Sequence, residues 1–158
     1  MSLKQLNILL ADDDVDDCQF FKEALETMPV LAELTAVHDG EQLMYLLTHE
    51  TKKLPDILFL DLNMPRKNGF ECLTEIKQNK KLKDLPVVIF STSFEQEVVN
   101  LLYDNGAHFF IRKPSEFASF KKIILYTLTL IMLENVSKPT KRKFCTYVRK
   151  QCDCLANY

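Results

Sequence analysis

Short apolar runs recur along the chain. Four of them are rich in Ile, Val, Leu and Phe and cover residues 7–11, 56–60, 86–90 and 108–111. A weaker fifth run covers residues 34–37. Runs of this length that lack alternation are typical of strands that are buried on both faces of a sheet. The pattern therefore predicts five strands.

Between these runs, apolar residues return every three or four positions, which places them on one face of a helix. The positions are Cys18, Phe21, Leu25 and Met28; Leu43, Leu46 and Leu47; Phe70, Leu73 and Ile76; Val98, Leu101 and Leu102; and Phe117, Phe120, Ile124, Leu128 and Ile131. Strands that alternate with helices imply parallel pairing. We therefore expect a doubly wound α/β domain, in which a five-stranded parallel sheet carries helices on both faces.

Polar residues follow the predicted strands at their carboxyl ends. Because these ends meet at one edge of a parallel sheet, we expect their side chains to lie close together. They are Asp12, Asp13 and Asp14, then Asp61, then Ser91, then Lys113. Two carboxylate charges about 5 Å apart repel by roughly 3 kcal/mol at an effective dielectric near 20, so the cluster calls for a cation. Oxygen ligands without His or Cys favour a hard ion such as Mg²⁺.

Phosphoryl transfer is the chemistry that such an edge suits. It needs a nucleophile, a metal ion and fixed positive charge, which here would be Asp61, the cation and Lys113. Ser91 would donate a hydrogen bond to a phosphoryl oxygen. A strand-end Asp is often only a helix N-cap, and we keep that interpretation for Asp14. Capping explains neither the shared edge nor Lys113.

Four sequence segments occur in the order and at the spacing of a known family: NILLADDD, DILFLDLNMPRKNGFECLTEIK, LPVVIFSTS and GAHFFIRKP. In these segments the chain resembles the receiver domains of bacterial two-component response regulators. The resemblance implies a flavodoxin-like fold with strand order 2-1-3-4-5. It also implies a stand-alone, single-domain regulator, and the segments are most similar to the type paired with phytochromes.

The resemblance assigns a role to each residue at the edge. Asp61 would accept a phosphoryl group from a histidine kinase or phosphotransfer protein. Mg²⁺, or Mn²⁺ in its place, would be bound by Asp13, Asp61 and the backbone carbonyl of Asn63, with Asp12 acting through water. Lys113 would pair with Asp61 and then with the phosphoryl group, and its bond to Pro114 would be cis.

Two further positions match the switch residues of the family. Ser91 supplies the hydroxyl that moves toward the phosphoryl group, and Phe110 is the aromatic residue that turns inward behind it. Plain core packing is an equal alternative for Phe110. The expected output face comprises residues 95–105, the fifth strand and residues 116–133, which would bind an unidentified downstream protein or a second copy of the chain.

The length of 158 residues suits one domain, at 5–134, and a basic C-terminal tail at 135–158. The tail is too short for a helix-turn-helix output module, and a solvated tail is favoured over contact with an anionic partner. A net charge of -2 gives no general attraction to nucleic acid. Neither a signal peptide nor a membrane span is found, so we expect a cytoplasmic protein.

Three other function classes are alternatives to the phosphoacceptor switch, which would catalyse only its own phosphorylation and dephosphorylation. A phosphatase of the haloacid-dehalogenase class needs a second Asp two residues after the nucleophile, where this chain has Asn63. A flavin or nucleotide binder needs a glycine-rich phosphate loop, and none of the three glycines lies in one. A pseudo-receiver, which binds partners without phosphorylation, would normally have lost its acidic residues.

Overall fold

The computed structural model describes residues 4–50, 53–93 and 95–133. It contains one parallel sheet with the strand order β2-β1-β3-β4-β5, as expected from the resemblance. The strand bounds lie within two residues of the predicted runs. They are β1 (Leu6–Ala11), β2 (Ala32–Val37), β3 (Ile57–Leu60), β4 (Val87–Ser91) and β5 (Phe109–Arg112).

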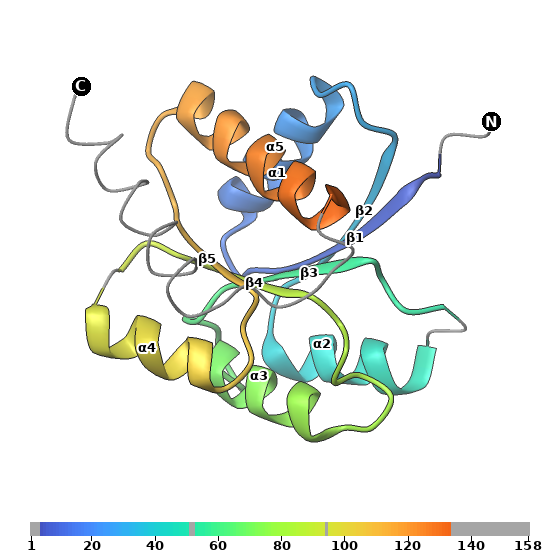
Figure 1. Ribbon diagram of the computed structural model, residues 1–158, viewed down its shortest axis with the longest axis vertical. Coiled ribbons are helices and arrows are strands. Elements are labelled where there is room, and N and C mark those ends of the chain that lie inside the picture. The colour runs from blue at the N-terminus through green and yellow to red at the C-terminus, as the bar shows by residue number, and fades with distance from the viewer. Residues whose placement is uncertain (1–3, 51–52, 94, 134–158) are drawn as a thin grey trace.

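Helices cover both faces of this sheet (Figure 1). Helices α1 (Val15–Glu26) and α5 (Phe117–Leu133) lie on one face. The opposite face carries α2 (Gly40–Tyr45), which continues into the π-helical segment η1 (Leu46–Glu50), together with α3 (Gly69–Gln78) and α4 (Gln96–Asp104). The predicted doubly wound architecture is therefore confirmed.

The sheet separates the core into two halves, because successive strand residues point to opposite faces. On β4, Val88 and Phe90 pack with α1 and α5, whereas Val87 and Ile89 pack with the helices of the other face. Phe21 of α1 packs edge-on against Phe59 of β3, with ring centroids 4.8 Å apart. Such an aromatic pair adds about 0.5–1.5 kcal/mol beyond its burial. These contacts hold α1 on the sheet beside the end of β1.

Two positions of the predicted apolar helix stripes are exposed. Phe70 of α3 is 37% exposed and Leu101 of α4 is 53% exposed. In their place, Cys72 and Val99 are fully buried. Each of these helices contains more apolar residues than its contact with the sheet can cover, so the periodicity identified the helix but did not fix its rotation.

Capping residues start two of the helices close to the strand ends. The Asp14 side chain accepts hydrogen bonds from the backbone N–H groups of Asp16 and Asp17, which confirms its interpretation as the N-cap of α1. Asn68 and Glu71 form a reciprocal capping box at the start of α3. Both caps fix the direction in which the chain leaves the carboxyl edge of the sheet.

No helix in the described part of the chain combines the length and apolar character that crossing a bilayer requires.

Candidate functional site

Three carboxylates meet at the carboxyl ends of β1 and β3. Ala11 and Leu60 are paired in the sheet, so the residues that follow them, Asp12 and Asp61, emerge side by side. Asp13 joins them, and one oxygen from each of the three carboxylates lies within 4.8 Å of the others. Asp12 and Asp61 are buried, whereas Asp13 is exposed. The structure thus brings together the three acidic residues that were predicted to cluster.

Lys113 reaches this cluster from the end of β5. Its Nζ atom lies 2.6 Å from Asp12 Oδ2, 2.8 Å from Asp17 Oδ2 and 3.3 Å from Asp61 Oδ2. An ammonium has three N–H donors, so each carboxylate can accept one. The Lys113 side chain is only 6% exposed. Burial by itself would lower the pKa of Lys113, but the hydrogen bonds to Asp12 and Asp17 and the charge of Asp61 raise it above its usual value.

Asp61 is buried among groups that act on its charge in opposite directions. Burial, reinforced by the negative charge of Asp12, raises the pKa of Asp61 from 3.8 to about 6. The ammonium of Lys113 and the Asn63 backbone N–H, which donates to Asp61 at 3.3 Å, act against this rise. Nearby groups therefore compensate the negative charge of the Asp61 carboxylate only in part, and a divalent cation would compensate the rest.

Asp12 already uses both carboxylate oxygens. Oδ1 accepts the backbone N–H of Asp14 at 3.0 Å, and Oδ2 accepts Lys113. Its backbone carbonyl accepts the Cys18 thiol at 3.5 Å and lies 3.1 Å from His38 Nδ1. Asp13 and Asp61, by contrast, line an open pocket whose other walls are Asp14, Val15, Asp17, Asn63, Thr92 and Lys113. The donor set of this pocket suits a hard, oxygen-loving cation.

The two predicted switch residues lie away from the pocket wall. Ser91 is fully buried, and its hydroxyl lies 3.3 Å from the Ser93 hydroxyl and accepts the Ser93 backbone N–H at 3.4 Å. Phe110 is 1% exposed and belongs to the core half that contains Val99 and Leu102 of α4. Their positions behind the pocket suit both core packing and switching, so the switch role stays a prediction.

One expectation about the local backbone was wrong. No peptide bond among the described residues is cis, so the bond between Lys113 and Pro114 is trans. The trans isomer is also the intrinsically preferred one before proline, by about 0.5–1 kcal/mol.

Asp17 is the site residue that sequence reasoning missed. Acidic residues in the first turn stabilise a helix through its dipole, and this effect alone accounts for the presence of both Asp16 and Asp17 in the sequence. The position of the first turn of α1, directly after the carboxyl edge where Lys113 was expected, pointed to this turn, but it did not distinguish Asp17 from Asp16.

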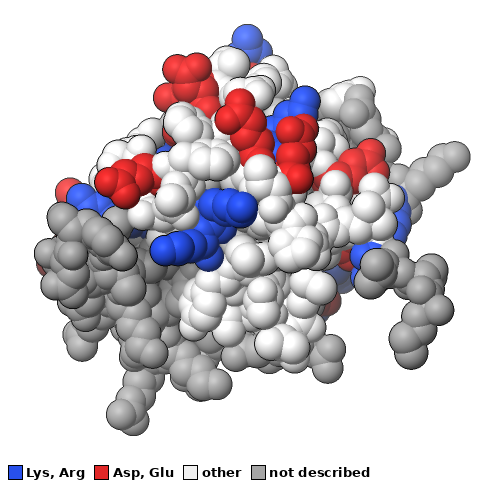
Figure 2. Space-filling model, turned by 90° about the horizontal axis from the view of Figure 1, so that it is seen from above, with Lys and Arg blue, Asp and Glu red and all other residues white. Residues whose placement is uncertain are grey.

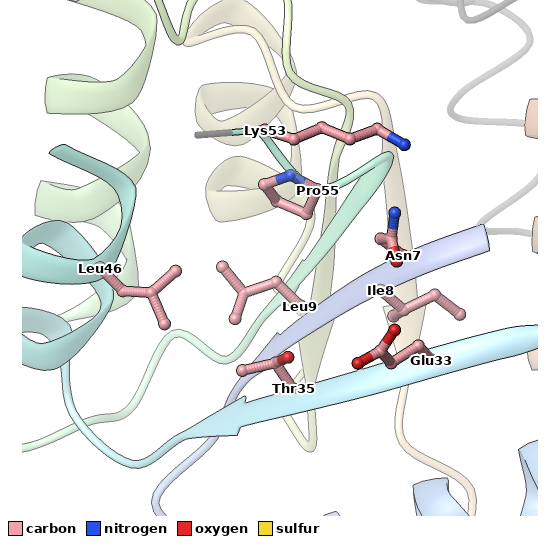
Figure 3. A pocket seen from close by; sticks show the side chains of 8 residues that line it. All are labelled: Asn7, Ile8, Leu9, Glu33, Thr35, Leu46, Lys53 and Pro55. Carbon is pink, nitrogen blue, oxygen red and sulfur yellow. The ribbon is translucent and has the colours of Figure 1, made fainter. Parts of the chain in front are cut away.

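A second hollow lies toward the amino end of β1, away from the cluster of Asp12, Asp13 and Asp61 (Figure 3). Asn7, Glu33, Thr35 and Lys53 contribute its polar groups, and Leu46 and Pro55 contribute apolar walls. It contains one carboxylate and one ammonium and lacks the clustered charge of the first pocket. The chemistry of this fold is therefore concentrated at the carboxyl edge, as expected for a parallel sheet.

Comparison with known proteins agrees with this geometry. The family model of the response regulator receiver domain matches residues 8–125 of this chain. The chain belongs to this family. Response regulator Rcp1 of Synechocystis sp. is 33% identical to this receiver over 136 residues, which cover 84% of this chain and 92% of Rcp1.

Solved receiver structures share the fold. The phosphorylated cyanobacterial phytochrome response regulator RcpA superposes with a TM-score of 0.75 at 31% identity, covering 87% of this receiver and all of RcpA. The Mn²⁺-bound form of Rcp1 gives a TM-score of 0.73 at 32% identity over 85% of this receiver and 99% of Rcp1. The predicted resemblance to stand-alone, phytochrome-associated regulators is thereby confirmed.

The chain is thus a receiver-domain response regulator of two-component signalling. Receiver domains are phosphoacceptor switches that histidine kinases phosphorylate, and they bind Mg²⁺ or Mn²⁺ at an acidic pocket. In this chain, Asp12, Asp13 and Asp61 form an acidic cluster.

Proposed function

We propose that this receiver accepts a phosphoryl group on Asp61 in the presence of Mg²⁺ and signals through a phosphorylation-dependent change in its partner-binding surface. The observation that carries the proposal is the contact of the Lys113 ammonium with Asp61, 3.3 Å away, in the same pocket as the acidic cluster. The receiver domain would span residues 5–134. The basic tail, 135–158, lies outside the described residues.

Asp13, Asp61 and the backbone carbonyl of Asn63 would hold the metal ion. Asp12 would act on it through water, because hydrogen bonds already occupy both of its carboxylate oxygens. Mn²⁺ would be an effective substitute, since it accepts the same oxygen ligands. When bound, the ion supplies positive charge for the phosphoryl oxygens and relieves the repulsion among the carboxylates.

The protein groups then have separate tasks in the reaction. A carboxylate oxygen of Asp61 attacks the phosphorus of a donor carried by a histidine kinase or phosphotransfer protein, and the leaving group departs with the bonding electrons. Lys113 donates to a phosphoryl oxygen, which requires no proton transfer because its raised pKa keeps it charged. Ser91 would donate to another oxygen after its hydroxyl turns from Ser93.

The output would be read at the face formed by α4, β5 and α5. Movement of Ser91 would change the space beside Phe110, which shares a core half with α4. Phosphorylation would then bias two packings of this region, and a downstream protein or a second copy of the receiver would bind one of them.

The decisive experiment is incubation with acetyl phosphate and Mg²⁺, followed by intact-mass measurement. We expect the wild-type protein to gain one phosphoryl group and Asp61→Asn to gain none, because an amide oxygen is a poor nucleophile. Asp84→Asn, at an exposed position outside the pocket, serves as the matched control and should still be phosphorylated. An unmodified wild-type mass would instead favour a pseudo-receiver.

A further inference from the structure

The close contact of Asp17 with Lys113 has no role in the function proposed above. Asp17 Oδ2 lies 2.8 Å from Lys113 Nζ, which is shorter than the 3.3 Å between Nζ and Asp61. The two residues are 96 positions apart in the sequence, and the Asp17 side chain is 29% exposed. Asp17 is also held from behind, because its backbone N–H donates to the N-cap Asp14. The start of α1 therefore aims this carboxylate at the lysine.

The geometry leaves the ammonium of Lys113 no spare donor. Its three N–H groups match the three carboxylates that lie within hydrogen-bond distance. To donate to an incoming phosphoryl oxygen, Lys113 must give up one of these acceptors. The question is which acceptor it gives up.

Burial and position identify Asp17 as that acceptor. Asp12 is fully buried, and its second oxygen is held by the Asp14 N–H, so it cannot withdraw without losing a buried contact. Asp61 is the residue to be phosphorylated. Asp17 lines the open pocket and is partly exposed, so its carboxylate can turn to water when Lys113 leaves it.

We propose that Asp17 is a positioning residue for Lys113. In the unphosphorylated receiver the Asp17 carboxylate holds the Lys113 ammonium, and it competes for this ammonium with the incoming phosphoryl group. The inference rests on the proposed phosphorylation of Asp61. In the step concerned, an Asp61 oxygen bonds to phosphorus while the bond from phosphorus to the donor breaks, at the imidazole nitrogen of a phosphohistidine or at an oxygen of acetyl phosphate, and the electron pair leaves with that donor atom. Lys113 keeps all its protons and exchanges one acceptor. Asp17 therefore slows the gain of phosphate.

The chain offers a matched control for the charge of Asp17. Asp16 lies in the same turn of α1, is exposed, and also donates its backbone N–H to Asp14, but it is not among the three acceptors of Lys113. Asp16→Asn removes the same charge from the same region without changing the lysine contact. Asp17→Glu keeps the charge and an acceptor within reach of Lys113, so it tests rescue by a conservative change.

The test compares phosphorylation rates with acetyl phosphate and Mg²⁺ in the full chain. We expect Asp17→Asn to be phosphorylated about three- to tenfold faster than the wild type, because an amide oxygen holds the ammonium more weakly than a carboxylate does and one repelling charge is removed. Asp16→Asn should change the rate less than about twofold, as an exposed charge is well screened. Asp17→Glu should return the rate to within about twofold of the wild type.

A second readout follows Lys113 without any phosphodonor. In the wild type and in Asp16→Asn, the ¹⁵N-labelled ammonium of Lys113 should exchange its protons slowly, and in Asp17→Asn it should exchange them faster. An unchanged ammonium signal in Asp17→Asn overturns the positioning role. Equal rates for the wild type and Asp17→Asn, equal rates for Asp16→Asn and Asp17→Asn, or failure of Asp17→Glu to restore the rate also overturn it.

These outcomes are separable from failure of the proposed function. A wild-type protein that gains no phosphate overturns the phosphorylation of Asp61 itself. A wild-type protein that is phosphorylated, together with an Asp17→Asn variant that is folded by thermal melting and has the wild-type rate, overturns only the role of Asp17.

Discussion

Asp61 has a side chain that is only 8% exposed and that must nevertheless be ionised to act as a nucleophile. Burial raises its pKa to about 6, and Lys113 limits the rise. At neutral pH the carboxylate is therefore charged but energetically unfavourable in the folded protein without metal. Such a carboxylate is stabilised most when a cation binds beside it or when a bond to a phosphoryl group removes its charge. The burial of Asp61 is therefore linked to its reactivity.

This conflict predicts a pH dependence of stability for the metal-free protein. The folded pKa of Asp61, about 6, exceeds its ordinary value of 3.8, so the folded state binds the proton more tightly between these values. The Asp61 contribution to the free energy of unfolding is therefore present below about pH 4 and is lost as the pH rises through 6. Asp61→Asn should be more stable than the wild type by about 1–3 kcal/mol at pH 7.5 and nearly equal to it at pH 4.

Urea unfolding in EDTA at several pH values measures this difference, and comparison with Asp61→Asn cancels the titration of other groups. A stability difference that is independent of pH, or an Asn variant that is less stable at pH 7.5, would contradict the raised pKa of Asp61.

Among the secondary-structure elements, α3 holds the loop after β3 in place through its first residue. Gly69 begins this helix so close to β3 that a Cβ atom there would overlap the Asp61 carbonyl oxygen and lie 2.8 Å from Leu62 Cα. Its N–H donates to the Leu62 carbonyl at 2.9 Å. The helix is thus in direct contact with the backbone that carries Asp61, the proposed phosphoacceptor, so a small displacement of α3 moves this residue.

Gly69→Ala should therefore reduce both stability and phosphorylation. The added methyl must push backbone atoms apart, at a cost of about 1–3 kcal/mol, and it displaces Asp61 from Lys113. Gly106→Ala is the control: its φ of 98° also disfavours a side chain, but the nearest atoms belong to the flexible Lys77 side chain. We expect Gly106→Ala to cost about 1 kcal/mol and to leave the acetyl phosphate reaction intact.

Urea unfolding and intact-mass kinetics on the two variants separate these effects. The account fails if both glycine variants lose phosphorylation equally, since the loss would then follow stability and not the position of Asp61.

In the molecule as a whole, the parallel sheet concentrates its chemistry at one edge. Acidic residues from β1 and β3 and the lysine from β5 meet there, although they are distant in the sequence. Seen from above the α1 and α5 layer, acidic and basic side chains gather in the upper half and centre of the view, and an uncharged area lies below them (Figure 2). Uncharged residues account for most of α5, whose exposed Tyr126, Met132 and Leu133 leave apolar surface on the output face proposed above.

Because the proposed metal ligands follow different strands, ion binding should stabilise the whole domain. We expect saturating Mg²⁺ to raise the melting temperature of the wild-type protein, since an ion that binds only the folded state adds about 2.7 kcal/mol at a concentration of 100 Kd. Asp13→Ala should abolish this rise. In EDTA the same variant should melt at a slightly higher temperature than the wild type, because an exposed anion has been removed from beside two buried ones.

Thermal melts with EDTA and with Mg²⁺ measure both effects. A lower melting temperature of Asp13→Ala in EDTA would argue against repulsion within the cluster, and a retained response to Mg²⁺ would remove Asp13 from the metal site.

Local patterns in the amino-acid sequence were sufficient to predict the elements of this protein and the edge that carries its chemistry. Buried strands and amphipathic helices leave short-range periodicities, so the five β-α units could be predicted, with strand bounds within two residues. Parallel pairing brings the carboxyl ends of strands to one edge, so the sequence alone predicted that Asp12, Asp13, Asp61 and Lys113 lie together. The strand order came from the family resemblance, because the same strands can be ordered in several ways.

The way in which these groups share their contacts could be learned only from the packed fold. The closest acceptors of Lys113 are Asp12 and Asp17, and Asp17 lies in the first turn of a helix where no local pattern distinguishes it from Asp16. The raised pKa of Asp61 and the placement of Ser91 behind the pocket likewise depend on distances between chain segments. Local patterns specify what each segment forms, whereas charges and hydrogen bonds act through space, and their partners exist only when the segments have packed.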